Sequence, residues 1–239
     1  LILDWDGTLT KKDTLHLIGT IGTNALRSRG IDITRFHPQQ DPDEPPWNTF
    51  GRLYMSDYAA LQSQYKPTPE ERRSVADEAA WLAALEPVEL ASMRRVEESG
   101  FLKGVMAEDV RREARRAVEN GEVQLRREWE RVFLEADLRT SVLRKGEKGI
   151  LAKAIQDCRI DANEIEGLDD PQGASGKLSK SGALGIRTSR DKLRLLRCEQ
   201  GVKNNLRRET NLVVYVGDSA TDLECLLAAD YGICMHDEP

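Results

Sequence analysis

Two aspartates stand directly after the first apolar run of the chain. Residues 1–3 lead into Asp4, and a second carboxylate follows at Asp6 before Gly7 and Thr8 turn the chain. A short apolar run bounded by turn residues is typical of a strand buried on both faces, and open α/β sheets bind ligands just past the ends of such strands. The pattern also fits an Asp-Gly turn or a helix cap, so this stretch alone leaves a chemical and a structural role open.

A second apolar run, near the other end of the chain, also ends in carboxylates. Residues 211–216 precede Asp218, and Asp222 follows about one helical turn later. If the two strands are neighbours, their carboxylates converge and repel one another unless a cation lies between them. A few hard oxygen ligands, with room left for water and phosphate, suit Mg²⁺. The predicted metal ligands are Asp4, Asp6, Asp218 and Asp222.

The two stretches resemble motifs of the haloacid dehalogenase-like (HAD) hydrolase superfamily. Residues 4–8 match the family's first motif, Asp-x-Asp-Gly-Thr, and residues 217–222 match its fourth, Gly-Asp-x-x-x-Asp. Lys192, in the first turns of an expected helix, matches the lysine of the third motif. The resemblance implies an α/β fold in which a Rossmann-like core with a parallel sheet carries an inserted all-helical cap.

The order of patterns along the chain predicts two domains. Residues 11–139 read as charged, amphipathic helices, and in the family an insertion at this point is a cap that closes over substrate. We therefore expect a core domain of residues 1–10 and 140–239 around a cap domain of residues 11–139. Within the cap, the aromatic stripe over residues 47–66 predicts core packing. A further helix is expected to start at Pro67 and to continue through Leu85.

One motif of the family is not visible. Residues 140–146 resemble the entry into the core domain in the phosphoserine phosphatase-like branch, and residues 160–165 resemble the strand that follows the second motif. Between Gly146 and Ile160, however, no apolar strand ends in Ser or Thr. Either the second motif was lost in evolution, or a mobile segment is missing from the sequence. We favour the second explanation because both chain ends also look trimmed and ligand loops are commonly mobile.

The resemblance implies a role for each matched residue. Asp4 would attack phosphorus and form an aspartyl-phosphate, and Asp6 would act as general acid and base. Mg²⁺ would be held by the carboxylate of Asp4, the backbone carbonyl of Asp6 and Asp218, with Asp222 close by, either as a ligand or as a group that supports the ligands. Gly7 and Thr8 would contact the substrate, and Lys192 would bridge the nucleophile and the phosphoryl group. The acid at position 6 favours a phosphatase, with a phosphomutase second, because dehalogenases lack it and ion-pumping ATPases carry Thr there. A small phosphorylated metabolite is the expected substrate, since a cap excludes bulky macromolecules.

Composition limits the partners that the protein is expected to bind. The 239 residues carry a net charge of -6, which disfavours a surface that coats nucleic acid. The basic run 111–116 is interpreted as an ion-paired face, with a phosphate-attracting rim as the alternative. No apolar stretch approaches the roughly 18 residues that span a bilayer, so no membrane partner is expected. The cysteines have no paired spacing and predict reduced thiols of a cytoplasmic protein: Cys158, Cys198, Cys225 and Cys234.

A hypothesis from another class competes with the enzyme. The chain could be a degenerate HAD fold that is kept as a binding or scaffold protein, with the helical cap as its interaction surface. The missing second motif favours this hypothesis. The complete set of four mutually repelling carboxylates argues against it, and the oligomeric state cannot be read from the sequence.

Overall fold

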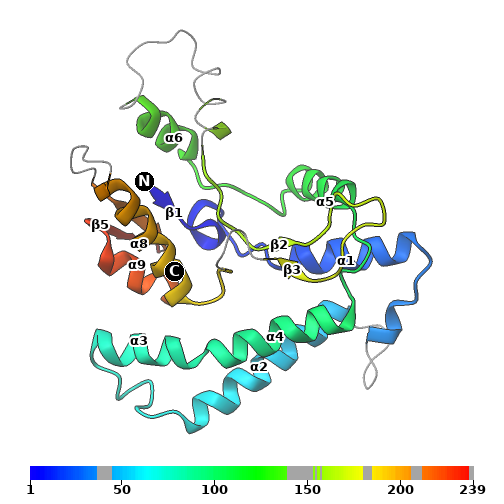
Figure 1. Cartoon of the computed structure of the whole chain (residues 1–239), viewed down its shortest axis with the longest axis horizontal. Helices are drawn as coiled ribbons and strands as arrows, with labels where there is room; N and C mark the ends of the chain where they lie inside the picture. The colour runs from blue at the N-terminus through cyan, green and yellow to red at the C-terminus, as the bar shows by residue number, and fades with distance from the viewer. Residues whose placement is uncertain are drawn as a thin grey trace.

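Short strands of the chain form a parallel sheet that lies beside a larger group of helices (Figure 1). The computed structural model describes residues 1–36, 45–138, 153, 155–156, 158–179, 185–205 and 212–236. The strands are β1 (Ile2–Leu3), β2 (Glu164–Ile165), β3 (Leu178–Ser179), β4 (Val214–Gly217) and β5 (Tyr231–Cys234). The helices are α1 (His16–Ser28), α2 (Pro46–Gln64), α3 (Val75–Ala84), α4 (Glu86–Ser99), α5 (Ala107–Glu119), α6 (Trp129–Leu138), α8 (Ser189–Asn205) and α9 (Leu223–Ala228). Shorter helical turns are η1 (Trp5–Leu9), η2 (Ile33–Phe36) and η3 (Ala220–Asp222). The mixed α/β class predicted from the sequence is thereby confirmed.

Strand β4 lies between β1 and β5 in a parallel three-stranded sheet. Ile2 lies opposite Tyr215, and Leu3 lies opposite Val216. The N–H of Asp4 continues the ladder by donating to the carbonyl of Val216 over 3.0 Å. Because parallel pairing brings the carboxyl ends of both strands to one edge of the sheet, the two carboxylate motifs are neighbours in space.

Helices α8 and α9 cover this sheet with an apolar face. Leu193 and Leu196 stand one turn apart on α8, and they pack with residues of β4 and α9. The buried members of this cluster are Leu193, Leu196, Val213, Tyr215 and Cys225. This small core holds the N-terminal turns of α8, which carry Lys192, against the edge of the sheet where the aspartates lie.

A second core fills the helical group. Phe101 has no exposed surface, and the rings of Phe36 and Phe50 meet it edge to face at centroid distances of 5.7 Å. The ring of Trp47 lies 6.1 Å from the same centre. Edge-to-face pairs add to the free energy of burial, so the aromatic residues at the start of α2 serve as core, as their spacing predicts.

The antiparallel hairpin β2–β3 joins this second core. Ile165 and Leu178 pair across the hairpin, and both pack against the cluster around Phe101. Ala174, between the two strands, is 2% exposed within the same cluster. Residues 164–178 therefore share their core with the helices, while the domain boundaries expected from the sequence stay a prediction.

The predicted start of the third helix is wrong. The helix begins at Val75 instead of Pro67, because Ser74 forms a capping box with Asp77. The hydroxyl of Ser74 accepts from the N–H of Asp77 over 3.1 Å, and a carboxylate oxygen of Asp77 accepts from the N–H of Ser74 over 3.0 Å. Reciprocal capping of this kind satisfies two backbone donors that a helix start otherwise leaves open, and Pro67 offers no such partner.

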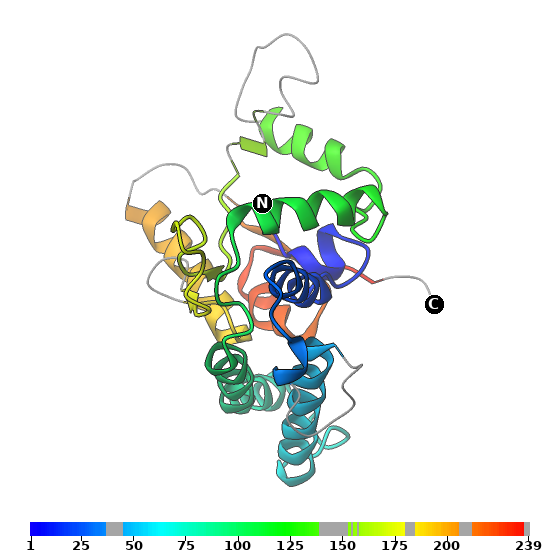
Figure 2. The same ribbon diagram turned by 90° about the vertical axis from the view of Figure 1, so that its right-hand side faces the viewer.

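Helix α3 joins the helical group to α9, one of the helices that cover the sheet. Trp81, Leu82 and Leu85 form a buried cluster, and Leu223 at the start of α9 packs against it. In Figures 1 and 2 α6 lies at the top and α2 at the bottom, with the sheet between them. The helical group thus contacts the start of α9 one residue after Asp222, beside the predicted metal ligands.

Three further expectations concern the second motif, a membrane-crossing helix and the cysteines. The second-motif segment expected between Gly146 and Ile160 lies largely outside the described residues. Among the described helices, none combines the length and the apolar character that crossing a membrane requires. No disulfide bond joins the cysteines at positions 158, 198, 225 and 234, all of which lie among the described residues.

Candidate functional site

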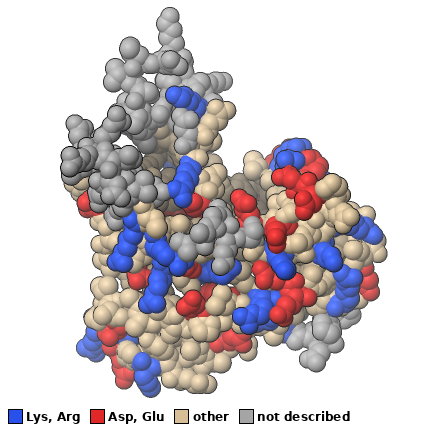
Figure 3. Space-filling model, viewed as in Figure 1, with Lys and Arg blue, Asp and Glu red and all other residues tan. Residues whose placement is uncertain are grey.

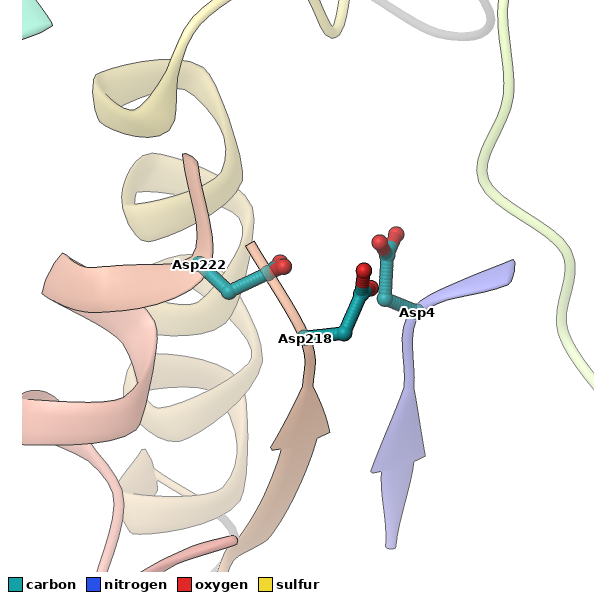
Figure 4. Close-up of side chains that lie close together, drawn as sticks. All are labelled: Asp4, Asp218 and Asp222. Carbon is teal, nitrogen blue, oxygen red and sulfur yellow. The ribbon is translucent and has the colours of Figure 1, made fainter. Parts of the chain in front are cut away.

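Three of the four predicted aspartates converge at the carboxyl edge of the sheet. Asp4 follows β1, Asp218 follows β4, and Asp222 closes η3, and each offers one carboxylate oxygen within 4.8 Å of the others. Figure 4 shows the side chains of Asp4 and Asp218 side by side at the strand tips, with Asp222 directed toward them from the adjoining helix. Convergent carboxylates from neighbouring strands are a suitable donor set for a hard divalent cation.

Lys192 neutralises part of this charge. Its Nζ lies 3.1 Å from Oδ1 of Asp4 and 2.8 Å from Oδ1 of Asp222. Burial alone would lower the pKa of Lys192, but the hydrogen bond to Asp222 and the charges of both acids outweigh it and hold that pKa above its usual value. The lysine predicted from the third motif is therefore a charged bridge between the two acids.

The two acids beside Lys192 respond in opposite directions. Burial raises the pKa of Asp4, and the charge of Asp222 adds to this effect, while Lys192 opposes it. Burial also acts to raise the pKa of Asp222, but hydrogen bonds from Lys192, Tyr215 and Ser219 outweigh it and lower that pKa. Asp222 is thus the better stabilised anion of the pair.

The carboxylate of Asp222 is saturated by protein donors. Its Oδ1 accepts from Lys192 Nζ and from the hydroxyl of Tyr215, each over 2.8 Å. Its Oδ2 accepts from the N–H and the hydroxyl of Ser219, over 3.2 and 2.9 Å. The side chain has no exposed surface. With four donors already placed, Asp222 is suited to orienting Lys192, and Asp4 and Asp218 are the carboxylates left to face a cation.

The turn after β1 lies against Asp218. The hydroxyl of Thr8 donates to Oδ1 of Asp218 over 2.9 Å. Gly7 has a φ of +68°, and a Cβ at this position would lie 2.2 Å from Oδ2 of Asp218. Position 7 therefore needs glycine for two reasons, the left-handed backbone and the close approach of the carboxylate.

Asp6 does not join the three aspartates through its side chain. Its Oδ1 accepts from the N–H and the hydroxyl of Thr14, each over 2.7 Å. The indole N–H of Trp5 donates to the same hydroxyl over 3.1 Å. Asp6 is therefore oriented by Thr14, just ahead of α1, and its carboxylate is not one of the three convergent groups.

Three residues of this site have no counterpart in the sequence prediction. Tyr215 contacts Asp222, Thr14 holds Asp6, and Arg126 donates to the turn at Gly7. A hydroxyl-bearing residue inside an otherwise aliphatic strand was a usable signal for Tyr215, because a buried hydroxyl needs a partner. Arg126 sits in a segment rich in charged residues, and nothing in its local pattern sets it apart.

Basic side chains on α5 are paired with acidic neighbours. Figure 3 shows acidic and basic side chains interspersed over the described part of one face. On α5, Arg112 lies 2.9 Å from Asp109, and Arg116 lies 2.8 Å from Glu113. The basic run over residues 111–116 thus forms an ion-paired face, as predicted, and the alternative of a phosphate-attracting rim is not needed to explain it.

Comparison with known proteins gives one distant similarity. No family model and no solved structure matches the chain. Among curated proteins, it is similar to the "Bifunctional TH2 protein, mitochondrial" of Arabidopsis thaliana, with 26% identity over 243 residues. The match covers 97% of this chain and 38% of the plant protein, so the chain spans about two fifths of the length of the curated relative that it matches. The similarity therefore runs through both the sheet and the helical group.

Proposed function

We propose that the chain is a Mg²⁺-dependent phosphomonoester hydrolase of the HAD type. The observation that carries the proposal is the position of Lys192, whose Nζ lies 3.1 Å from Asp4 at the end of β1 and 2.8 Å from Asp222 in η3, which follows the neighbouring parallel strand β4. A lysine held beside a carboxylate nucleophile is suited to phosphoryl transfer, because its positive charge can offset the negative charge of the transferred group. In this proposal the sheet with α8 and α9 is the Rossmann-like core, and the preceding helices are its cap.

Asp4 and Asp218 would hold the metal through their carboxylates, with the backbone carbonyl of Asp6 as a further ligand. Their oxygens fit Mg²⁺ by type, and their proximity without a full ring of protein donors fits an ion that keeps several waters. When bound, Mg²⁺ offsets negative charge on the phosphoryl group and on the aspartates around it. Asp222 would stay with Lys192 and act through it.

The first half of the reaction is assigned to Asp4. One of its carboxylate oxygens forms a bond to phosphorus while the ester oxygen leaves as an alkoxide and takes a proton from Asp6. Lys192 stays within hydrogen-bond distance of Asp4 and donates to the phosphoryl oxygens as charge develops. The product of this half is an aspartyl-phosphate on Asp4 and a free alcohol.

Water completes the cycle. Asp6 accepts a proton from the water that attacks phosphorus, the bond to Asp4 breaks, and inorganic phosphate leaves. Thr14 fixes the carboxylate that performs both proton transfers, since its N–H and hydroxyl both donate to Oδ1 of Asp6. The helices that contact Leu223 at the start of α9 would shield the site from bulk water and limit the substrate to a small phosphorylated metabolite.

The similarity to a plant protein named bifunctional supports a segment with an activity of its own. The chain corresponds to 38% of that protein, and its own sheet and helices supply all the residues of the candidate site. We therefore propose that the activity resides within this chain.

The test is phosphate release from p-nitrophenyl phosphate and a panel of phosphorylated metabolites. Wild type, Asp4→Asn and the control Asp169→Asn would be assayed with Mg²⁺ and with EDTA. Asp169 is an exposed aspartate outside the site, so its variant controls for the loss of a carboxylate as such. We expect turnover by wild type and by the control in Mg²⁺ only, and none by Asp4→Asn.

Other outcomes would contradict the proposal in distinct ways. Turnover that persists in EDTA or in Asp4→Asn would exclude this mechanism. Conversion of a phosphorylated sugar to its isomer without phosphate release would indicate a phosphomutase. Folded protein that binds Mg²⁺ but turns over no substrate would favour the scaffold hypothesis.

A further inference from the structure

Arg126 belongs to none of the motifs. It nevertheless contacts the turn of residues 7–9, which follows Asp4 and Asp6 and precedes Thr10. Its Nε donates to the carbonyl of Thr8 over 3.0 Å and to that of Gly7 over 3.2 Å. Its Nη2 donates to the carbonyl of Gly7 as well. One guanidinium group thus holds two consecutive carbonyls of this turn.

The backbone around Arg126 is joined to the same turn. The N–H of Arg126 donates to the carbonyl of Leu9 over 3.0 Å, and Thr10 forms an antiparallel bridge with Leu125. The N–H of Lys11 donates to the carbonyl at position 124 over 2.8 Å. The chain therefore pairs with itself where it leaves the first motif and where it returns from α5.

The turn that Arg126 binds also contacts Asp218. The hydroxyl of Thr8 donates to Asp218 over 2.9 Å, and Gly7 leaves no room for a Cβ beside that carboxylate. A shift of the turn would carry Thr8 with it, so the position of Asp218 depends on the position of the two carbonyls that Arg126 binds. The contacts form a continuous path from the return of the helical segment to a carboxylate of the site.

We propose that Arg126 is a positioning residue for metal binding: it holds the turn at Gly7 and Thr8 against Asp218. This inference rests on the proposed function, because it assigns Asp218 to Mg²⁺. Arginine suits the task, since its planar fork presents several donors in a fixed geometry to neighbouring acceptors. Lysine offers a single mobile ammonium group and cannot reproduce the grip of Nε and Nη2 on two carbonyls.

The test measures Mg²⁺ binding without substrate. Isothermal titration calorimetry with Mg²⁺ would be run on the full chain of wild type, Arg126→Lys and the matched control Arg127→Lys, which changes the exposed neighbour. Arg126→Lys keeps the positive charge, so a change in affinity reports the lost geometry. We expect the Kd for Mg²⁺ to rise about tenfold in Arg126→Lys and to stay within about twofold in the control.

A double-mutant cycle separates positioning from general loss of structure. Thr8→Val removes the hydroxyl that contacts Asp218, and we expect it to weaken Mg²⁺ binding on its own. If Arg126 acts through Thr8, the second substitution should add little to the first. The Kd of the double variant Arg126→Lys/Thr8→Val for Mg²⁺ should then stay within about twofold of the Kd of the weaker-binding single variant. If Arg126 only stabilises the fold, the fold-increases in Kd caused by the two single substitutions would multiply in the double variant. Should Arg126→Lys fail to fold, Arg126→Gln, which keeps a planar donor, takes its place in the cycle.

The outcomes distinguish this inference from the proposed function. Weakened and non-multiplying Mg²⁺ binding would support the role of Arg126, and unchanged Mg²⁺ binding in the Arg126 variant would overturn it even if wild type hydrolyses phosphate esters. Wild type that binds Mg²⁺ but lacks turnover would overturn the proposed function, and the titrations would still decide the role of Arg126. Wild type that does not bind Mg²⁺ would overturn both.

Discussion

The hydroxyl of Tyr215 donates a hydrogen bond of 2.8 Å to Oδ1 of Asp222, inside the core that joins the sheet to α8. Burial raises the pKa of Tyr215 well above its usual range, and the neighbouring Asp222 raises it further. The hydroxyl is therefore a donor throughout the neutral range. It helps to fix the oxygen that also accepts from Lys192.

Tyr215→Phe is expected to reduce turnover through this contact. Without the hydroxyl, Asp222 loses a buried donor and Lys192 loses a fixed partner, so kcat should fall about tenfold while KM changes little. The free energy of unfolding should fall by about 1.5–3 kcal/mol, the usual contribution of a hydrogen bond to a charged group. Steady-state kinetics and urea unfolding of the same preparations would measure both effects.

Tyr54→Phe is the matched control for this prediction. Tyr54 donates to Glu89 over 2.8 Å, between α2 and α4, so the same hydroxyl is removed from a carboxylate away from the site. Comparable destabilisation with unchanged kinetics is expected. Equal losses of kcat in the two variants would reduce the role of Tyr215 to stability alone.

Lys192→Met is expected to separate metal binding from turnover. The substitution keeps the length of the side chain but removes the charge from between Asp4 and Asp222. Loss of one charged donor to a phosphoryl group should lower kcat/KM by about 10²–10³-fold. Mg²⁺ should bind more tightly, because a like charge has been removed from beside its ligands.

Phosphatase assays and calorimetric titration with Mg²⁺ test these two directions together. Lys177→Met, which changes an exposed lysine in the hairpin segment, serves as the control and should leave both quantities unchanged. Retained turnover in Lys192→Met would contradict the assigned role of the lysine.

Residues of the site could be predicted from the sequence only where a motif specifies both the residue type and its place at the end of a strand. Asp4 and Asp218 follow apolar runs, and parallel pairing of β1 with β4 brings them together as the pattern requires. The side chain of Asp6 could not be placed, because its partner Thr14 lies in an ordinary loop before a helix. Arg126 could not be found either, since its role arises from tertiary contacts with backbone carbonyls, which any arginine can make.

The sequence predicted the fold well where apolar residues repeat at helical spacing over a long stretch. The prediction failed at the start of α3, which depends on a local capping interaction. The aromatic spacing of α2 was sufficient to predict a helix, whereas the next helix was expected to start at Pro67 and instead begins after Ser74. The capping box at Ser74 sets this start, because it satisfies backbone donors reciprocally. The hairpin of residues 164–178 packs on the helices through Ala174 and Leu178, a choice of partner that periodicity alone does not encode.

Asp109 predicts a loss of stability in acid. Its carboxylate lies 3.0 Å from Arg29 and 2.9 Å from Arg112, and it accepts from the N–H of Met106 over 3.0 Å. Burial alone would raise the pKa of Asp109, but that N–H and the guanidinium groups outweigh it and lower the pKa. The carboxyl of Asp109 has a pKa of about 3.9 in the unfolded state and a lower pKa in the folded state. Between these two pKa values the unfolded state binds more protons, so the free energy of unfolding rises with pH there.

The stabilisation from Asp109 is thus present above about pH 4 and is lost as the pH falls through the lower pKa of the folded state. Asp109→Asn should lower the free energy of unfolding by about 1–3 kcal/mol at pH 7, and the difference from wild type should shrink in acid. Urea unfolding at neutral and acidic pH measures it, with Asp169→Asn as an exposed control. A difference that stays constant as the pH falls would refute the ion-pair explanation.

Gly7 and Gly30 offer a comparison that isolates the close approach at the site. Both have left-handed backbones, with φ of +68° and +69°, so alanine at either position should cost about 1–2 kcal/mol of stability. A Cβ at Gly30 would meet no atom within 4 Å, whereas a Cβ at Gly7 would lie 2.2 Å from Oδ2 of Asp218. Gly7→Ala should therefore also displace Asp218, weaken Mg²⁺ binding at least tenfold and abolish most turnover, while Gly30→Ala loses stability alone. Thermal unfolding, Mg²⁺ titration and phosphate release on both variants would decide the matter, because equal effects on Mg²⁺ affinity would mean that backbone strain, and not the contact with Asp218, is what position 7 contributes.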